Sequence, residues 1–251
     1  MRPATDEERK RLGVPPAYTN VRISDDPNAD LRAVATTPKG KTFYLYSKAF
    51  RARNDAKKWT RVRKLNAKME KVEARIDRDA QAGNGIAICA RLILQTGLRN
   101  GGEPQGDKPS FGASSLLLEH CSVHGNVVRL QFPGKHAVPQ DVKVEDAMFA
   151  AYVRSRSGEV KLFDHDASQT LRYMKSVGAA KVHDLRTWRA NVLAQMLVEE
   201  LLKLEKPTSA KARKIFQKAV AERVAEVLGN KPAQALKSYI DPKVWEPLGE
   251  E

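Results

Sequence analysis

The sequence contains little that would support export, a membrane span or a disulfide-stabilised fold. Only two cysteines, Cys89 and Cys121, occur among 251 residues, which fits a reducing compartment rather than a disulfide framework. The first residues, MRPATDEE, lack the apolar segment of a secretion signal. No apolar run reaches the ~18 uninterrupted residues that a membrane-spanning helix needs. We therefore expect a soluble, cytoplasmic protein with no membrane partner.

Several common catalytic motifs are missing as well. The five histidines do not fall with cysteines or carboxylates at metal-ligand spacing, and neither a Walker lysine loop nor a Gly-x-Ser-x-Gly turn occurs. Metal, nucleotide and serine chemistry are therefore poorly supported. No internal repeat of about 20 to 50 residues is visible, so the architecture must be read from local periodicity.

Acidic residues are fewer than basic residues, and most of the difference arises in one segment. The chain has 44 Lys and Arg against 30 Asp and Glu, a net charge of +14. Between residues 39 and 64 there are ten basic residues and one acid, Asp55, so this segment carries 10 − 1 = +9. The ten are Lys39, Lys41, Lys48, Arg51, Arg53, Lys57, Lys58, Arg61, Arg63 and Lys64. Such a patch favours contact with backbone phosphates of duplex DNA over a merely solvated helix face.

The hydrophobic pattern predicts an α+β protein with two unequal domains. Alternating apolar residues over 14–46, separated by turn signals at 25–28 and 38–40, predict a small antiparallel sheet. After Phe50 apolar residues recur every three or four positions through Ile76, which is typical of a helix. We place the domain boundary on this helix, giving a small basic β domain (1–62) and a larger, mostly helical domain (63–251).

Within the larger domain the pattern predicts four further helices and a hairpin. The helices are expected over 84–98, 166–177, 184–205 and 209–228, the last with Ser209 as N-cap. Two β segments, 127–132 and 142–144, flank Pro133-Gly134-Lys135-His136, which predicts a hairpin with Lys135 at or near its turn. We interpret the charged, proline-containing stretch 203–213 as a mobile linker between helices.

Four chemistry-bearing residues fall at the ends of these elements: Arg99, Lys135, Arg186 and Tyr239. Arginine forks suit nonbridging phosphate oxygens, a lysine can protonate a leaving alkoxide, and a tyrosine can hold phosphate covalently. Together they would form a metal-free phosphoryl-transfer site. Taken singly, Arg186 could pair with a surface acid and Tyr239 could fill the core, so spacing alone leaves both interpretations open.

The same residues lie in segments that resemble type IB DNA topoisomerases of the bacterial and viral kind. The matching segments occur in the family's order over about 12–248. They are VPPAYTNVRI (14–23), PKGKTFYLY (38–46), TGLRNGGE (96–103), SFGASSLL (110–117) with His120, FPGK (132–135), DLRTW (184–188), LGNKP (228–232) and KSYIDP (237–242).

The resemblance implies a clamp around duplex DNA, formed by a small β domain and a helical catalytic domain. Tyr239 would attack a backbone phosphodiester to give a 3′-phosphotyrosyl enzyme and a free 5′-hydroxyl. Arg99, Arg186 and Asn230 would hold the phosphate oxygens, and Lys135 would protonate the departing 5′-oxygen. The enzyme would relax supercoils as a monomer, with no metal, ATP or other cofactor, at the nucleoid or in viral or host cytoplasm.

We also expect DNA contacts in the basic segment, from Lys39, Lys41, Tyr44, Tyr46, Lys57, Lys58 and Arg61. The two tyrosines share one strand face, opposite Phe43 and Leu45, and are equally compatible with an ordinary half-buried strand.

Three points depart from the family's pattern. The sheet before the Pro-Pro-Ala-Tyr segment is short, a glycine expected after Lys135 is missing, and His183 stands where a lysine that aids the acid step is common. His183 is therefore a candidate catalytic residue, although it could simply pack at the start of its helix.

Two other functions remain open at this point. A tyrosine site-specific recombinase uses the same chemistry and also suits the segments around Arg99 and Arg186, and His183 favours it. The basic β segment and Asn230, where recombinases usually have histidine, favour the topoisomerase. A DNA-binding module that has lost catalysis is the third candidate, although all four chemistry-bearing residues are present.

Overall fold

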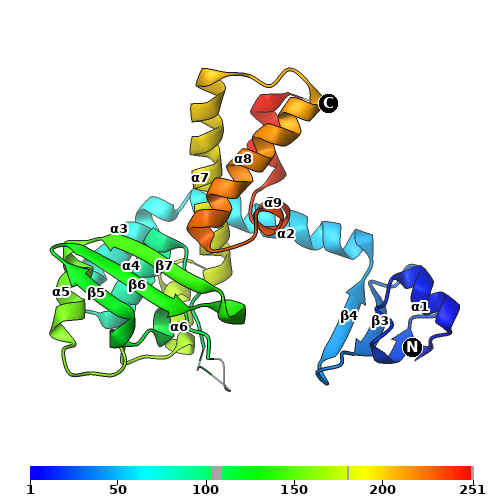
Figure 1. Cartoon of the computed structure of the whole chain (residues 1–251), viewed down its shortest axis with the longest axis horizontal. Helices are drawn as coiled ribbons and strands as arrows, with labels where there is room; N and C mark the ends of the chain where they lie inside the picture. Colours follow the sequence, from blue (N-terminus) through cyan, green and yellow to red (C-terminus); the bar gives the residue numbers. More distant parts are fainter. Residues whose placement is uncertain (103, 105–108, 180, 250–251) are drawn as a thin grey trace. The chain divides into compact units, whose positions relative to one another are not determined.

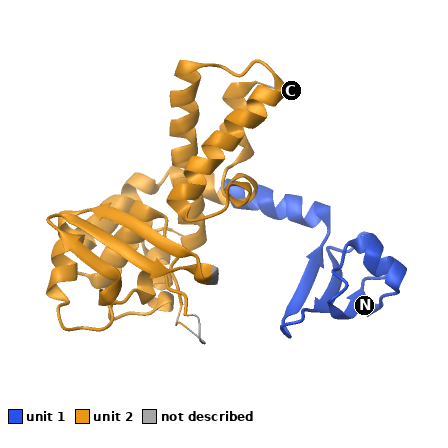
Figure 2. Ribbon diagram, in the orientation of Figure 1, with its two compact units in different colours: residues 1–60 blue, residues 61–251 orange. Residues whose placement is uncertain are grey.

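The computed structural model describes residues 1–102, 104, 109–179 and 181–249. The chain divides into two compact units, residues 1–60 and residues 61–251 (Figure 2). Helix α2 (Lys48–Asn66) begins in the first unit and ends in the second. Along the described part of the chain, no helix combines the length and apolar character needed to cross a membrane.

The first unit is an antiparallel sheet with one short helix (Figure 1). Its strands follow the order β1 (Arg2–Pro3), β2 (Thr19–Ile23), β3 (Leu31–Thr36) and β4 (Thr42–Tyr46). Alternate side chains point into a small core made of Val14, Val21, Ile23, Ala33 and Ala35. The predicted sheet is therefore confirmed, with β1 as an edge strand that the sequence pattern did not indicate.

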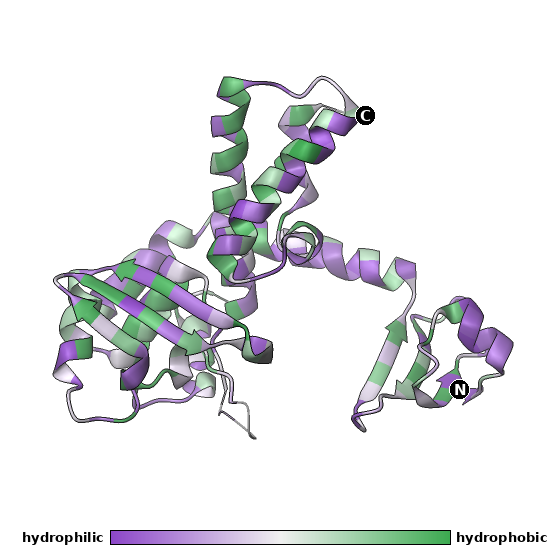
Figure 3. Cartoon of the chain, viewed as in Figure 1, coloured by the Kyte–Doolittle hydropathy of each residue, from purple (hydrophilic) through white to green (hydrophobic). Residues whose placement is uncertain are grey.

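Helix α1 (Asp6–Leu12) was not predicted, because it buries none of its own residues. Figure 3 shows it as almost wholly hydrophilic. Its local signals are strong nevertheless. Thr5 and Glu8 form a capping box, and Gly13 ends the helix with a left-handed φ of 68°.

The second unit is mostly helical. After the end of α2 it contains α3 (Met69–Gln81), α4 (Gly85–Thr96), α5 (Ala147–Ser155), α6 (Ala167–Ser176), α7 (Val182–Leu204), α8 (Ala210–Leu228) and α9 (Pro232–Ser238). The four predicted helices correspond to α4, α6, α7 and α8, and Ser209 caps α8 by accepting from the Ala212 amide at 3.1 Å. The helix expected from 50 to 76 is instead two helices, with a turn at 67–68 that no glycine or proline marks.

The predicted hairpin is part of a three-stranded antiparallel sheet, β5 (Cys121–His124), β6 (Val127–Pro133) and β7 (Pro139–Glu145). Buried and exposed residues alternate along β6, and hydrophobic and hydrophilic residues alternate with them (Figure 3). Short 3-10 turns complete the unit: η1 (Ala113–Ser115), η2 (Leu118–His120), η3 (Lys135–Ala137) and η4 (Pro242–Leu248).

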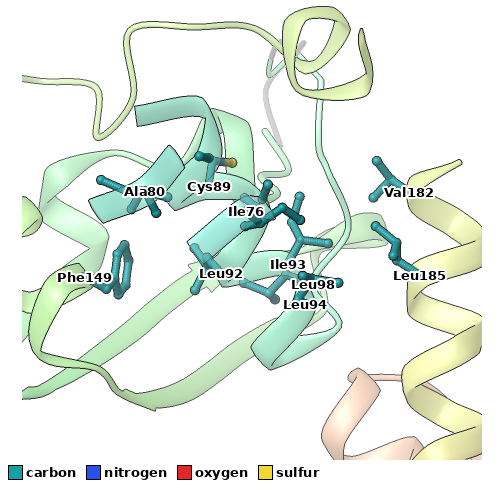
Figure 4. Packing of buried hydrophobic residues seen from close by; sticks show 14 of the residues in the cluster. Ile76, Ala80, Cys89, Leu92, Ile93, Leu94, Leu98, Phe149, Val182 and Leu185 are labelled. Atoms are coloured by element: carbon teal, nitrogen blue, oxygen red, sulfur yellow. The ribbon is translucent and has the colours of Figure 1, made fainter. Parts of the chain in front are cut away.

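Two apolar clusters hold the second unit together. The larger surrounds α4, whose residues Cys89, Leu92 and Ile93 are almost fully buried against α3, α6, α7 and the β sheet (Figure 4). The smaller joins the C-terminal part of α7 to α8, α9 and η4. Because α7 takes part in both clusters, its first turns lie where the two meet, and this is where the predicted catalytic residues converge.

Candidate active site

Arg186 lies in the second turn of α7 and is 4% exposed. Its guanidinium donates to the carbonyl oxygens of Gly97, just after α4, and Leu228, the last residue of α8. These helix ends present unsatisfied carbonyls and the negative end of the helix dipole, which stabilises a buried cation. Arg186 therefore ties two helix ends together and does not pair with a surface acid.

Arg99 reaches the same place from the segment after α4. Gly97 ends the helix with a left-handed φ of 67°, which turns the chain sharply. Leu98 is then buried, and the Arg99 carbonyl accepts from the Ala113 amide at 2.8 Å. The backbone is thus fixed on both sides of the arginine.

Asn230 joins the two arginines. Its side-chain oxygen accepts from Arg186 at 3.2 Å and from Arg99 at 3.4 Å. Burial, followed by the neighbouring charge of Arg99, lowers the pKa of Arg186 to about 10. Two cations therefore lie close together at this point, an arrangement that favours an anion between or beside them.

Two donors at this place are buried and unused. Among the described residues, Nδ2 of Asn230 and Nε of Arg186 are buried without a hydrogen-bond partner. Buried polar atoms are almost always satisfied, so such donors call for an explanation, and an absent ligand is one. An oxyanion seated here would accept from both groups.

These residues line one cavity of about 630 Å³. Arg99, Arg186 and Asn230 contribute to its wall, and Lys135 lines it from the turn between β6 and β7. Lys231 adds a further cation beside Asn230. The prediction that Lys135 lies at the hairpin turn is confirmed, since η3 begins with it.

Tyr239 is not among the residues that line this cavity. It caps the C-terminal end of α9, is 3% exposed and belongs to the smaller apolar cluster. Arg186 connects it to the cavity, because the guanidinium carbon lies 5.5 Å from the centre of the tyrosine ring. The Tyr239 hydroxyl also interacts with Arg186 and raises its pKa, against the larger effect of burial.

His183 lies beside Tyr239. The two rings are stacked, with centroids 5.4 Å apart, and Nδ1 of His183 lies 3.4 Å from the Thr187 hydroxyl. The histidine is exposed at the start of α7 and is absent from the cavity wall. Its position brings it next to the predicted nucleophile.

The structure adds residues that sequence reasoning did not select. Asn191 donates to the Tyr239 carbonyl at 2.8 Å and accepts from the Asp241 amide at 2.7 Å, so it fixes the backbone around the tyrosine. Asp241 also pairs with Arg63 at 2.5 Å. An asparagine five residues after Arg186, within an apolar stretch of the predicted helix, was the available signal, since polar side chains that become buried almost always have a partner.

The predicted DNA-contact residues occupy different settings in the first unit. Lys39 and Lys41 lie at the β3–β4 turn, and the rings of Tyr44 and Tyr46 stack at 6.4 Å on one face of β4, with Tyr44 52% exposed. On α2, Lys57 is exposed, whereas Lys58 pairs with Asp55 at 3.1 Å and lies over the ring of Trp59.

Arg61, in the second unit, forms a two-point ion pair with the buried Asp184, through Nε to Oδ2 at 3.0 Å and Nη2 to Oδ1 at 3.3 Å. Its predicted DNA contact stays a prediction.

In the ranges that the structure describes, no three His, Cys, Asp or Glu side chains lie together as the ligands of a metal ion would.

The geometry gathers cations and unpaired donors around one cavity, and comparison with known proteins identifies the family. Residues 47–246, about four-fifths of the chain, match the family described as "Eukaryotic DNA topoisomerase I, catalytic core". Residues 2–36 match "Bacterial DNA topoisomerase IB, N-terminal domain". The chain therefore belongs to the type IB DNA topoisomerase family, as the sequence motifs predicted.

A curated relative supports the assignment. DNA topoisomerase 1B of Acanthamoeba polyphaga mimivirus is 24% identical over 261 aligned positions, which cover 93% of this chain and 77% of the viral protein.

Among solved structures, the XerH site-specific recombinase bound to palindromic difH substrate in a post-cleavage complex matches with TM-score 0.47 and 15% identity. A pre-cleavage XerH complex matches with TM-score 0.42 and 15% identity. Both cover 72% of this chain, and the chain spans about half the length of those recombinases. Likeness at this level defines neither substrate nor activity.

Proposed function

We propose that this protein relaxes supercoiled duplex DNA by cutting one strand through a 3′-phosphotyrosyl intermediate, allowing the free end to swivel, and resealing the strand. The observation that carries the proposal is the convergence of Arg99, Arg186 and Asn230 on one cavity, with two buried donors left without acceptors. A backbone phosphodiester carries the acceptor oxygens and the negative charge that this arrangement fits.

Arg99 and Arg186 would bind the nonbridging oxygens of the scissile phosphate. Charge on these oxygens grows as the attacking oxygen approaches phosphorus, and fixed guanidinium groups stabilise that charge without having to reorganise. Arg186 is held by two helix ends, so its position is set before DNA arrives. Nδ2 of Asn230 would supply a further hydrogen bond to the same phosphate.

Tyr239 would supply the nucleophile. Its hydroxyl oxygen would bond to phosphorus as the bond from phosphorus to the 5′-oxygen breaks, and its proton would pass to solvent or a nearby base. Arg186 lies against the tyrosine and would stabilise the charge that develops on the phenolic oxygen. Since Tyr239 is almost fully buried, DNA binding must expose its hydroxyl to the phosphate.

Lys135 would donate the proton that the departing 5′-oxygen needs. It lines the same cavity as the arginines, from the turn between β6 and β7. In religation the 5′-hydroxyl attacks the phosphotyrosine, Lys135 takes the proton back and Tyr239 leaves. The phosphotyrosyl bond conserves the energy of the broken bond, so the proposed cycle needs neither ATP nor a metal.

His183 would act on the tyrosine rather than on the leaving group. Its ring stacks on Tyr239, and it is not among the residues that line the cavity with Lys135. We therefore propose that His183 orients the nucleophile. A direct part in the acid step, which the sequence suggested, would require it to reach the 5′-oxygen once DNA is bound.

The first unit would contribute affinity rather than chemistry. Lys39, Lys41 and Lys57 are exposed cations that fit duplex phosphates, and such contacts are largely independent of sequence. Tyr44 and Tyr46 present a stacked aromatic pair on β4. We propose residues 1–62 as the DNA-gripping domain and residues 63–251 as the catalytic domain of a monomer.

Trapping the intermediate tests the proposal. A duplex labelled on the strand to be cut is incubated with the protein in EDTA and quenched with detergent. We expect a labelled covalent complex whose DNA is joined through its 3′ end to Tyr239, located by peptide mapping. Attachment through another residue, or through a 5′ end, would refute the assignment. Exchange of strands between two duplexes, with no relaxation, would indicate the recombinase alternative.

A further inference from the structure

Gln140 occupies a slot between two glycines that each precede a predicted catalytic residue. Gly134 comes directly before Lys135, and Gly229 comes directly before Asn230. A Cβ built on Gly134 would lie 2.8 Å from Cγ of Gln140, and one built on Gly229 would lie 2.9 Å from its Nε2 and 3.0 Å from its Cδ. The Gln140 side chain therefore packs closely against both backbones, and a side chain added at 134 or 229 would force it to move.

Gln140 connects the β6–β7 turn, which carries Lys135, to the α8–α9 junction, which carries Asn230. Gln140 lies on β7, opposite Phe132 of β6, and its Nε2 donates to the carbonyls of Val138 and Pro139 at 3.3 and 3.2 Å. These bonds fix the side chain to the turn that carries Lys135. Its other surface meets the α8–α9 junction, which carries Asn230, and both glycines and Gln140 line the cavity.

We propose that Gln140 is a positioning residue that sets the distance between Lys135 and the phosphate seat at Asn230. This inference rests on the proposed function, because it assigns Lys135 to the acid step. Lys135 is exposed on a short turn, so its own contacts do little to hold it. The Gln140 side chain keeps the turn docked against the α8–α9 junction.

The expected effect is specific to one step. Proton transfer depends steeply on placement, and a shift of about 1 Å can cost on the order of a hundredfold in rate. Without Gln140 the turn loses this packing against the α8–α9 junction, while Arg99, Arg186 and Asn230 keep their own partners. Phosphate binding should therefore survive and protonation of the 5′-oxygen should suffer.

The test compares single-turnover cleavage of two duplexes, one ordinary and one with sulfur in place of the bridging 5′-oxygen at the scissile phosphate. Sulfur leaves without needing much protonation, so a defect confined to the acid step disappears on this substrate. We expect Gln140→Ala to slow ordinary cleavage at least tenfold and sulfur-substrate cleavage less than threefold. Lys135→Ala should show the same pattern with a larger defect.

Gln131→Ala is the matched control. Gln131 is an exposed glutamine on β6 of the same hairpin, and its amide donates to Asp141 at 3.2 Å, away from the slot. Removing it deletes the same side chain from the same sheet. Both cleavage rates should remain within twofold of those of the unaltered protein.

A second pair of variants tests the slot itself. Gly134 has a φ of −82°, which alanine adopts readily, so Gly134→Ala brings only the collision with Gln140. We expect this variant to show the acid-step defect when alone. It should add little to Gln140→Ala, because the atoms its Cβ would meet are then gone.

Equal slowing of both substrates by Gln140→Ala, or no slowing of ordinary cleavage, would overturn the inference while leaving Lys135 in its role. If Lys135→Ala itself gains nothing from the sulfur substrate, the proposed acid step fails first. Additive defects in the double variant would show that Gly134 and Gln140 act separately, which also contradicts the slot.

Discussion

The ion pair between Arg61 and Asp184 offers a test that separates a structural contact from a DNA contact. Asp184 is 2% exposed and precedes Arg186 by two residues, whereas the Arg61 side chain is 40% exposed. Arg61→Ala would leave a buried carboxylate without its partner in the first turn of α7. The same substitution would remove a phosphate contact if Arg61 instead served DNA.

The size of the structural effect follows from this uneven burial. Breaking a fully buried pair costs about 3 to 5 kcal/mol, whereas exposed pairs contribute less than about 1 kcal/mol. With one partner buried and the other open to solvent, we expect a loss of about 1 to 3 kcal/mol. For a chain of this size, that lowers Tm by roughly 2 to 12 °C.

Two measurements distinguish the interpretations. We expect Arg61→Ala to lower Tm by the amount given above and to leave the salt dependence of DNA affinity nearly unchanged. The double variant Arg61→Ala/Asp184→Asn should recover part of the lost stability, because the buried carboxylate is then replaced by a neutral amide. Lys57→Ala, an exposed lysine on the same helix, should leave Tm unchanged and reduce the slope of log affinity against log salt by about 0.9. An unchanged Tm in Arg61→Ala, with a slope reduced by that amount, would refute the structural interpretation.

Three further predictions concern the surroundings of the site. His120 accepts a backbone hydrogen bond through Nδ1 and burial lowers its pKa, so the folded protein disfavours its protonated form. The contribution of His120 to stability should therefore be complete above pH ~6.5 and be lost as the pH falls through the lowered pKa. Tm measured from pH 7 to pH 5 should fall less in His120→Asn than in the unaltered protein. Asn191→Ala should slow single-turnover cleavage of the ordinary and the sulfur substrate equally, because it removes a hydrogen bond to the Tyr239 backbone and leaves the proposed acid, Lys135, in place. A smaller defect on the sulfur substrate than on the ordinary one would contradict this. If His183 orients the tyrosine, His183→Gln should slow cleavage of both substrates alike, whereas a catalytic acid role would make the defect disappear with sulfur.

Much of the fold was predictable because hydrophobic periodicity dominates it. Helix α4 and the strands of both sheets bury one or both faces, and their patterns are clear in the sequence. Helix α1 depends on capping alone and buries nothing, so periodicity could not reveal it. The break at 67–68 was also hidden, because the apolar spacing runs through it without interruption.

The candidate site was predictable as a set of residue types but not as an arrangement. Motifs identified Arg99, Lys135, Arg186 and Asn230, and the structure brings all four to one cavity. The burial of Tyr239 and its stacking on His183 depend on contacts between α7 and α9, which are distant in sequence. The Gln140 slot was equally inaccessible, because it depends on two glycines almost one hundred residues apart meeting one side chain.

The most direct test of the central claim is relaxation of supercoiled plasmid in EDTA without ATP, with the unaltered protein beside Tyr239→Phe. We predict a ladder of relaxed topoisomers with the unaltered protein and none with the variant. The variant should still bind the plasmid nearly as well, since it lacks only one hydroxyl among many phosphate contacts. Relaxation by Tyr239→Phe, or no relaxation by the unaltered protein, would contradict the proposed function.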